Sequence, residues 1–143
     1  MRDQQFRIVL NNDVSEIERL GRELEAFGAS CGLSAKSVFE LNLVLEEIVA
    51  NVISYAYTDE RRHEIVIGAA LAQGIVVIEV EDDGRPFNPL QVPPPDFCCS
   101  LEEMPVGGRG LHLVRTLTDG LFYERAGEKN RLVMRKNIES ISQ

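Results

Sequence analysis

The chain is poor in cysteine, in basic residues and in long apolar runs, and each shortage excludes a class of protein. Cys31, Cys98 and Cys99 are its three cysteines. They are odd in number and two are adjacent, so they form no even disulfide framework; this favours reduced thiols and a cytoplasmic protein. No apolar run reaches the roughly 18 residues that cross a membrane, and the first residues lack the apolar region of a signal peptide.

Positive charge is also scarce. Lys and Arg together number 15 against 23 Asp and Glu, which gives a formal net charge of −8. An acidic surface repels nucleic acid phosphates, and no basic cluster is long enough to anchor an anionic membrane, so we expect no nucleic acid or membrane partner. The two histidines, His63 and His112, have no Cys or His at ligand spacing, so we expect no zinc site.

What is present has the composition of a globular domain. Hydrophobic residues make up 44% of the chain and charged residues 27%. A length of 143 residues suits one domain with a single core, so we expect one domain over residues 1–143.

Hydrophobic periodicity predicts the order of the elements along the chain. We expect a strand at 6–10, a helix capped within 11–13 that runs through Phe27 and ends at Gly28 and Gly32, a long helix from Ser34 to about Tyr55 or Tyr57, strands at 64–71 and 75–81, a loop over 82–106, a short helix opened by 107–110, and a hairpin around Gly127. A loop of that length in a compact domain is usually functional. Because most strands are joined by hairpins, this order predicts an α/β fold with a mixed, mostly antiparallel sheet and helices packed on one face.

Glu47 and Asn51 lie four residues apart on the long helix, so they share one face at the edge of the apolar stripe. A carboxylate and an amide there need polar partners. An Asn oxygen suits Mg²⁺, and a Glu can orient or deprotonate a hydroxyl. The alternative is a solvated helix flank with a chance spacing.

Asp82 and Gly84 stand where the strand 75–81 ends. Asp82 continues the inward-facing alternation of that strand, so its carboxylate needs a fixed donor, and the exocyclic amine of adenine is one. Gly84 lets the backbone approach a ring closely. The alternative is an exposed turn, because Asp-Gly is a common turn dipeptide.

Gly107, Gly108, Arg109 and Gly110 open the short helix. Glycines expose backbone N–H groups at a helix N-terminus, where phosphate binds, and Arg109 adds a positive charge. This is no Walker A loop, because no Gly-Lys-Ser/Thr follows.

In this order the three motifs resemble those of the GHKL ATPase superfamily, which includes gyrase, histidine kinases and MutL-type proteins. Its N box resembles Glu47…Asn51, its G1 box Asp82-Asp83-Gly84 and its G2 box Gly108-Arg109-Gly110. Within the superfamily the chain is most similar to the anti-sigma-factor serine kinases of bacterial partner switching. The features that carry this resemblance are a lone ATPase domain, the stretch 45–53 followed by Ala56-Tyr57, Phe87-Asn88-Pro89, a short Pro-rich lid and the stretch 105–111.

The resemblance implies a two-layer Bergerat-type sandwich that binds ATP with Mg²⁺ and transfers the γ-phosphoryl group to a Ser or Thr of a STAS-type anti-anti-sigma partner. It also implies a sigma factor as a second partner and a homodimer. The implied roles are hydroxyl orientation or base catalysis for Glu47, Mg²⁺ and nucleotide binding for Asn51, adenine binding for Asp82, the purine slot for Gly84 and Phe87, and phosphate binding for Gly107, Gly108, Arg109, Gly110 and Leu111.

Two positions depart from the family pattern. Tyr55 stands where the serine kinase branch often has His, and Asn130-Arg131-Leu132 replaces the Gly-Thr that often precedes the last strand, so a Thr contact to adenine is not carried over. Arg115 and Arg125 are expected on the solvated surface. The alternative function is a module that senses ATP or ADP and sequesters a partner without phosphorylating it. A third reading, a detached kinase-like domain acting on histidine, lacks a substrate His helix in this chain.

Overall fold

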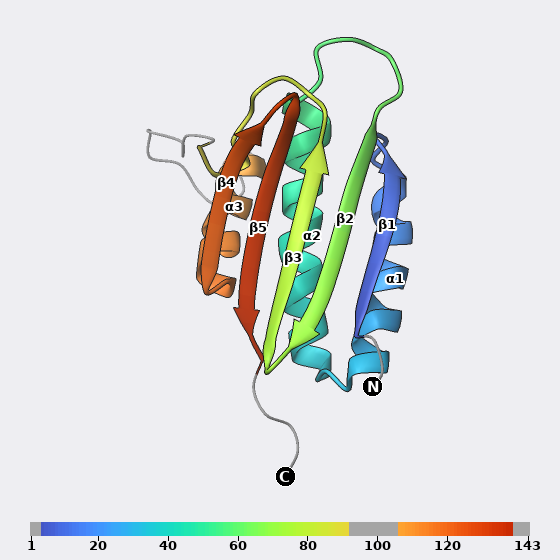
Figure 1. The fold of residues 1–143 in the computed structure, drawn as a ribbon, viewed down its shortest axis with the longest axis vertical. Helices are drawn as coiled ribbons and strands as arrows, with labels where there is room; N and C mark the ends of the chain where they lie inside the picture. The colour runs from blue at the N-terminus through green and yellow to red at the C-terminus, as the bar shows by residue number, and fades with distance from the viewer. Residues whose placement is uncertain (1–3, 92–105, 139–143) are drawn as a thin grey trace.

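The computed structural model describes residues 4–91 and 106–138. The described elements are, in chain order, β1 (Gln5–Asn11), α1 (Glu16–Cys31), α2 (Ala35–Tyr55), β2 (Glu64–Ala72), β3 (Ile75–Asp82), the 3-10 turn η1 (Pro89–Gln91), α3 (Val106–Leu117), β4 (Gly120–Ala126) and β5 (Lys129–Asn137). The strands form one sheet in the order β1-β2-β3-β5-β4, and every described pairing is antiparallel. All three helices lie against the same face of this sheet (Figure 1). The predicted two-layer α/β fold is confirmed, and the described sheet is antiparallel throughout instead of mixed.

The core lies between the sheet and the helices. Each strand turns alternate side chains inward, as on β3, where Val76, Ile78 and Val80 are buried and Asp82 is the next inward residue. α2 lies behind the middle of the sheet and contacts both other helices. The fully buried large side chains are Leu10, Leu20, Leu24, Leu41, Val44, Leu45, Ile48, Val49, Ile65, Ile67, Ile78 and Met134.

The predicted bounds of α1 need two corrections. The helix is preceded by Ser15 and not by a capping residue within 11–13, because the Asp13 side chain accepts a hydrogen bond from the Ser15 N–H (2.9 Å) in a turn before the helix. Gly28 does not end the helix but lies inside it. A Cβ on Gly28 would lie 2.4 Å from Val38 Cγ2, so glycine here permits the close approach of α1 and α2. Gly32 ends the helix as predicted, with a φ of 74°.

Other boundaries agree with the sequence prediction. Ser34 caps α2, and its side chain accepts a hydrogen bond from the Ser37 N–H (3.1 Å). The turn between β2 and β3 places Gln73 and Gly74 at φ values of 56° and 79°. Gly127, with a φ of 62°, turns β4 into β5. Such positive φ values are those of tight hairpin turns.

The predicted loop over 82–106 is described only in part. Asp82 is still the last residue of β3, and η1 forms a short turn after it. The expected Pro-rich lid, with Cys98 and Cys99, lies in 92–105, outside the described residues. Within the described parts of the chain, no helix is both long and apolar enough to cross a membrane.

Candidate nucleotide site

Three parts of the fold that carry the sequence motifs meet at one end of the molecule. The strand β3 ends there, the last turns of α2 lie there, and α3 begins there (Figure 1). α2 contacts both α3 and η1. The topology therefore brings the three motifs, far apart in sequence, to one side of the helix layer.

α2 contributes Glu47 and Asn51. Asn51 is only 3% exposed, and its amide nitrogen Nδ2 has no hydrogen bond acceptor among the described residues. A buried amide N–H without an acceptor is destabilising by about 1–3 kcal/mol, so it indicates a polar ligand. Glu47 lies one helical turn earlier and is half-buried. The two side chains offer carboxylate and amide oxygens, the ligands that Mg²⁺ prefers, so this pair fits a magnesium ion bound with phosphate.

β3 contributes Asp82, which is 3% exposed. Its Oδ1 accepts hydrogen bonds from the Gly84 N–H (2.8 Å) and from Nδ2 of Asn130 (2.9 Å). Burial raises the pKa of the Asp82 carboxyl and outweighs the opposing effect of these two hydrogen bonds; Asp83 raises the pKa further and Arg125 lowers it. A carboxylate kept at this depth is suited to a hydrogen bond donor from a ligand.

Gly84 seats the segment after β3 on the end of α2. A Cβ on this residue would lie 2.4 Å from the carbonyl oxygen of Ala56 and 2.8 Å from its Cβ. The next residue, Arg85, donates its backbone N–H to the same carbonyl (2.8 Å). The sequence prediction attributed this glycine to the approach of a ring, whereas the contact present in the structure is with α2. The glycine is required by this contact, whatever else the exposed side of the segment binds.

Asn130 is the site residue that sequence reasoning missed. It is 2% exposed, and it faces Asp82 in the register of β3 and β5. The signal was available: Asn130 is an inward position on the strand that continues with Leu132 and Met134, so a polar side chain there needs partners. The departure from the family pattern noted above therefore falls on a residue that contacts Asp82 directly.

Phe87 and Tyr55 form an aromatic pair, here called the aromatic border, at the end of the molecule where β3 ends. Their ring centroids are 5.7 Å apart at an interplanar angle of 38°, and Tyr55 is 41% exposed. Arg85 Nε donates to the Tyr55 carbonyl (2.8 Å), which ties the two segments together. The position of Phe87 is compatible with the purine slot that the resemblance implies.

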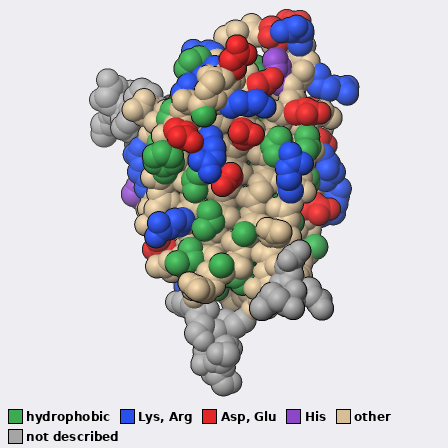
Figure 2. Space-filling model, in the orientation of Figure 1, with side chains coloured by type: hydrophobic (Ala, Val, Ile, Leu, Met, Phe, Trp, Pro, Cys, Tyr) green, Lys and Arg blue, Asp and Glu red, His purple; other side chains and the backbone are tan. Residues whose placement is uncertain are grey.

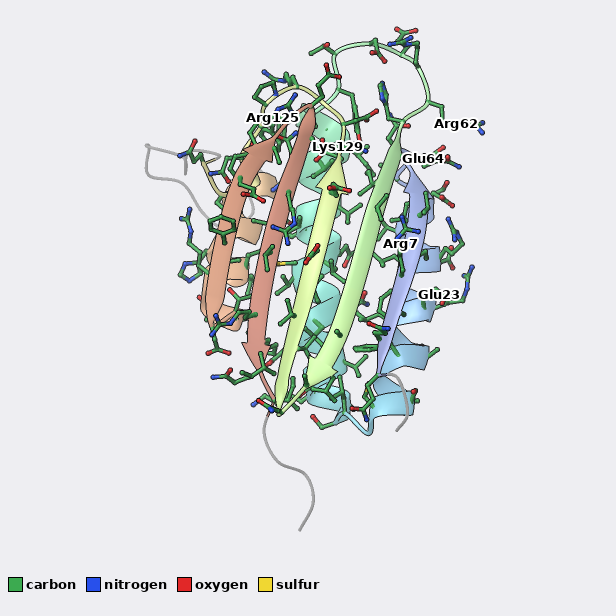
Figure 3. The ribbon with its side chains drawn as sticks, in the orientation of Figure 1. Arg7, Glu23, Arg62, Glu64, Arg125 and Lys129 are labelled. Atoms are coloured by element: carbon green, nitrogen blue, oxygen red, sulfur yellow. The ribbon has the colours of Figure 1, made fainter. Side chains whose placement is uncertain are left out.

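Arg115 and Arg125 are less free than predicted. Arg125, labelled in Figure 3 at the top of β4, donates from Nη1 to the Gly84 carbonyl (2.7 Å). Arg115 donates from Nη2 to the carbonyl of Leu90 in η1. Both side chains are exposed and nevertheless fix the segment between β3 and η1. The predicted surface position of both residues is confirmed, and each guanidinium group also binds a backbone carbonyl.

The glycine motif forms the first turn of α3. The helix begins at Val106, so Gly107, Gly108 and Gly110 have helical backbone, as the sequence predicted. Leu111, also assigned to the site, is 3% exposed, so its side chain belongs to the core and only its backbone is available to a ligand. The N-terminus of a helix carries partial positive charge, which suits phosphate.

A second polar cluster, also unforeseen, lies beside the end of β3 and includes Asp83. The His63 ring stacks on Tyr57 (4.4 Å between centroids) and lies between Asp59 (Nε2 to Oδ1, 2.8 Å) and Asp83 (Nδ1 to Oδ1, 3.2 Å). Hydrogen bonding to Asp59 raises the pKa of His63. Burial and the nearby Asp82 and Asp83 raise the pKa of Tyr57, so its hydroxyl stays neutral. No group of three or more metal-ligating side chains occurs among the residues that the structure describes.

Comparison with known proteins gives one family and consistent relatives. The profile of the histidine kinase-like ATPase domain matches residues 10–136. The serine/threonine-protein kinase BtrW of Bordetella bronchiseptica is 30% identical over 71% of this chain and 71% of its own length. The serine-protein kinase RsbW of Listeria monocytogenes is 28% identical over 86% of this chain and 81% of its own, and an anti-sigma F factor of Clostridium botulinum is 25% identical over 82% of each.

A solved structure supports the fold independently. The crystal structure of the RsbU and RsbW domains of a Mycobacterium tuberculosis protein superposes with a TM-score of 0.69 at 17% identity, over 94% of this chain. This chain spans about a third of that protein, since the match covers 32% of it. These findings confirm the resemblance drawn from the three motifs and, through the names of the relatives, the expected class of protein serine/threonine kinases.

Proposed function

The chain belongs to the histidine kinase-like ATPase domain family, and we propose that it is an ATP-dependent protein serine/threonine kinase and anti-sigma factor acting on a STAS-type anti-anti-sigma protein. We treat residues 1–143 as one ATPase domain. One observation carries the proposal: Asn51, Asp82 and the start of α3 lie at the same end of the helix layer. Asn51 and Asp82 are buried, and the Asn51 amide nitrogen has no acceptor among the described residues.

Each motif has one task in the proposed reaction. Asp82 accepts a hydrogen bond from the 6-amino group of adenine, with Gly84 and Phe87 beside the ring. Gly107, Gly108, Arg109, Gly110 and Leu111 hold the phosphates at the start of α3. Asn51 would hold Mg²⁺, which would supply positive charge against the phosphates in a chain of net charge −8.

Glu47 is the catalytic residue in this scheme. The partner's Ser or Thr oxygen bonds to the γ-phosphorus of ATP while the bond from that phosphorus to the β-phosphate bridging oxygen breaks. Glu47 orients the hydroxyl and accepts its proton, and ADP leaves. Such transfer depends on positioning and charge neutralisation more than on covalent chemistry, so one well-placed carboxylate suffices.

The neighbouring Glu46 provides a matched control. Both residues lie on α2, but Glu46 is exposed whereas Glu47 is half-buried. In the test, the protein is incubated with γ-labelled ATP, Mg²⁺ and the STAS protein whose gene lies nearest to the gene of this chain. We expect wild type and Glu46→Gln to label a Ser or Thr of the STAS protein and Glu47→Gln to bind ATP with a loss of transfer of about 100-fold or more. Equal transfer by Glu47→Gln would remove this residue from the mechanism.

The same assay decides between the two candidate functions. A protein that binds ATP or ADP and the partner, but transfers no label, is a nucleotide-sensing binding module. The acidic charge of the chain suits a protein ligand with a basic patch in either case. A sigma factor is the second proposed partner, and we place the protein in the cytoplasm, where ATP and both partners are found.

We also propose that two copies associate. The outer face of the sheet carries no helix among the described elements, and an open hollow of about 580 Å³ there is lined by small and apolar residues such as Gly68 and Val77 together with the charged Arg7 and Glu79. Figure 2 shows that charges of both signs cluster on the upper part of this face and thin out below it. A mass of twice 16.0 kDa in light scattering is expected, and a strictly monomeric protein would contradict it.

A further inference from the structure

The amide of Asn130 uses its full hydrogen bonding capacity. Nδ2 donates to Asp82 Oδ1 (2.9 Å) and to the Arg85 carbonyl (2.8 Å). Oδ1 accepts from the Phe87 N–H (3.1 Å) and from the Tyr123 hydroxyl. A flipped amide would point its oxygen at two acceptors and its nitrogen at the Phe87 N–H, so the orientation of this side chain is determined by its surroundings.

This arrangement determines which oxygen of Asp82 is available. Both hydrogen bonds that the structure gives this carboxylate, from Gly84 and from Asn130, fall on Oδ1. These two hydrogen bonds fix the orientation of the Asp82 carboxylate at the end of β3. Oδ2 is then the oxygen that can accept a hydrogen bond from a further donor. The same amide binds Arg85 and Phe87, so the orientation of Asp82 is coupled to the segment that carries the aromatic border of the site.

We infer that Asn130 is a positioning residue for nucleobase selection: it turns Oδ2 of Asp82 toward the 6-amino group of a purine and holds the Arg85–Phe87 segment beside the ring. This rests on the proposed function, since it assumes that Asp82 receives adenine. Asn130 acts through Asp82 and touches no reacting atom. An Asn can do this because it donates twice and accepts twice, whereas a hydroxyl side chain has one hydrogen to donate.

The inference predicts a change in base selection and not merely weaker binding. Inosine triphosphate differs from ATP in having an oxygen in place of the 6-amino group, so it presents an acceptor at position 6 where ATP presents a donor to Oδ2. Loss of the Asn130 contact should weaken the binding of ATP much more than that of inosine triphosphate, because only ATP has the amino group that Oδ2 accepts from. A purely structural role would weaken both nucleotides alike.

The experiment measures the dissociation constants of both nucleotides, with Mg²⁺, for the full chain. Asn130→Leu keeps the size of the side chain and removes its polar atoms. Asn137→Leu is the matched control, because Asn137 is exposed at the opposite end of the same strand. We expect wild type and the control to prefer ATP, and Asn130→Leu to lose about tenfold of that preference.

A second variant covers the case that Asn130→Leu does not fold. Tyr123→Phe removes only the hydroxyl that donates to Asn130 Oδ1, and we expect a loss of ATP preference of about two- to threefold. If folded Asn130→Leu keeps the wild-type ratio, the inference is overturned; if it is unfolded, the ratio of Tyr123→Phe decides in its place. A wild type that binds ATP and inosine triphosphate equally also overturns the inference, whereas a wild type that binds neither refutes the proposed function itself.

Discussion

Replacing Gly84 by alanine tests whether the end of β3 is seated on α2. The added Cβ would lie 2.4 Å from the Ala56 carbonyl oxygen, whereas carbon and oxygen atoms in contact are ordinarily about 3.3–3.6 Å apart. The segment must therefore move by about 1 Å away from a backbone atom that cannot turn aside. This movement also lengthens the bond from the Arg85 N–H to the same carbonyl.

The expected loss of stability follows from these two contacts. Overpacking of a close contact is destabilising by about 1–3 kcal/mol and a lost backbone hydrogen bond by about 1 kcal/mol. We therefore expect Gly84→Ala to lower the free energy of unfolding by about 2–4 kcal/mol, measured by urea denaturation. Gly68→Ala is the control, because the atom nearest to its Cβ would be the Phe6 carbonyl at 3.8 Å. It should stay within about 0.5 kcal/mol of wild type.

A double variant identifies the contact responsible. Ala56→Gly removes the Cβ that would lie 2.8 Å from the new methyl group of Gly84→Ala but leaves the carbonyl at 2.4 Å. It should restore less than half of the lost stability, because backbone is the nearer obstacle. A Gly84→Ala variant as stable as wild type would refute the claim that the end of β3 packs against the Ala56 backbone. Full recovery of stability in the double variant with Ala56→Gly would refute it as well.

Three further predictions concern buried or paired polar groups at this end of the molecule. Asp82→Asn keeps the acceptor Oδ1 and removes a carboxylate whose pKa is raised by burial, so it should raise the melting temperature by roughly 3–5 °C at pH 7 while weakening ATP binding, as read by calorimetry. Asn51→Leu removes a buried amide that lacks an acceptor in the described part of the chain, so its melting temperature should also rise while Mg²⁺-dependent ATP binding is lost; a lower melting temperature would show that the amide has a structural partner. Asp59 and Asp83 raise the pKa of His63 in the folded state, so protonated His63 stabilises the fold fully below about pH 6.5, and this stabilisation disappears as the pH rises through the raised pKa. His63→Gln should therefore make the urea midpoint of unfolding less dependent on pH across that range. An unchanged pH dependence of the midpoint would contradict the role of His63.

The fold was largely predictable because its elements follow strong local rules. The apolar stripe of α2 with its Ser34 cap, and the hairpin at Gln73-Gly74, express periodicities of 3.6 and 2 residues that tertiary contacts do not override. The start of α1 was not predictable in this way, because several polar residues in a row can each cap a helix. The place of Gly28 depended on Val38, which lies on another helix.

The site was predictable only as far as its motifs. Glu47 and Asn51 follow from spacing on one helix, and Asp82 follows from strand alternation. Asn130 escaped because its role depends on the register of β3 against β5, which pairs residues 48 positions apart. Long-range pairing of this kind is not contained in any local pattern.

The central claim is that α2 and the end of β3 together hold one adenine nucleotide with its magnesium ion. Calorimetric titration of the wild-type chain with ATP and Mg²⁺, beside Asn51→Leu and Asp82→Asn, tests it most directly. The account predicts one nucleotide per chain and a loss of affinity of about tenfold or more in each folded variant. A wild-type chain that releases no heat of binding at millimolar ATP, or variants that bind as the wild type does, would contradict it.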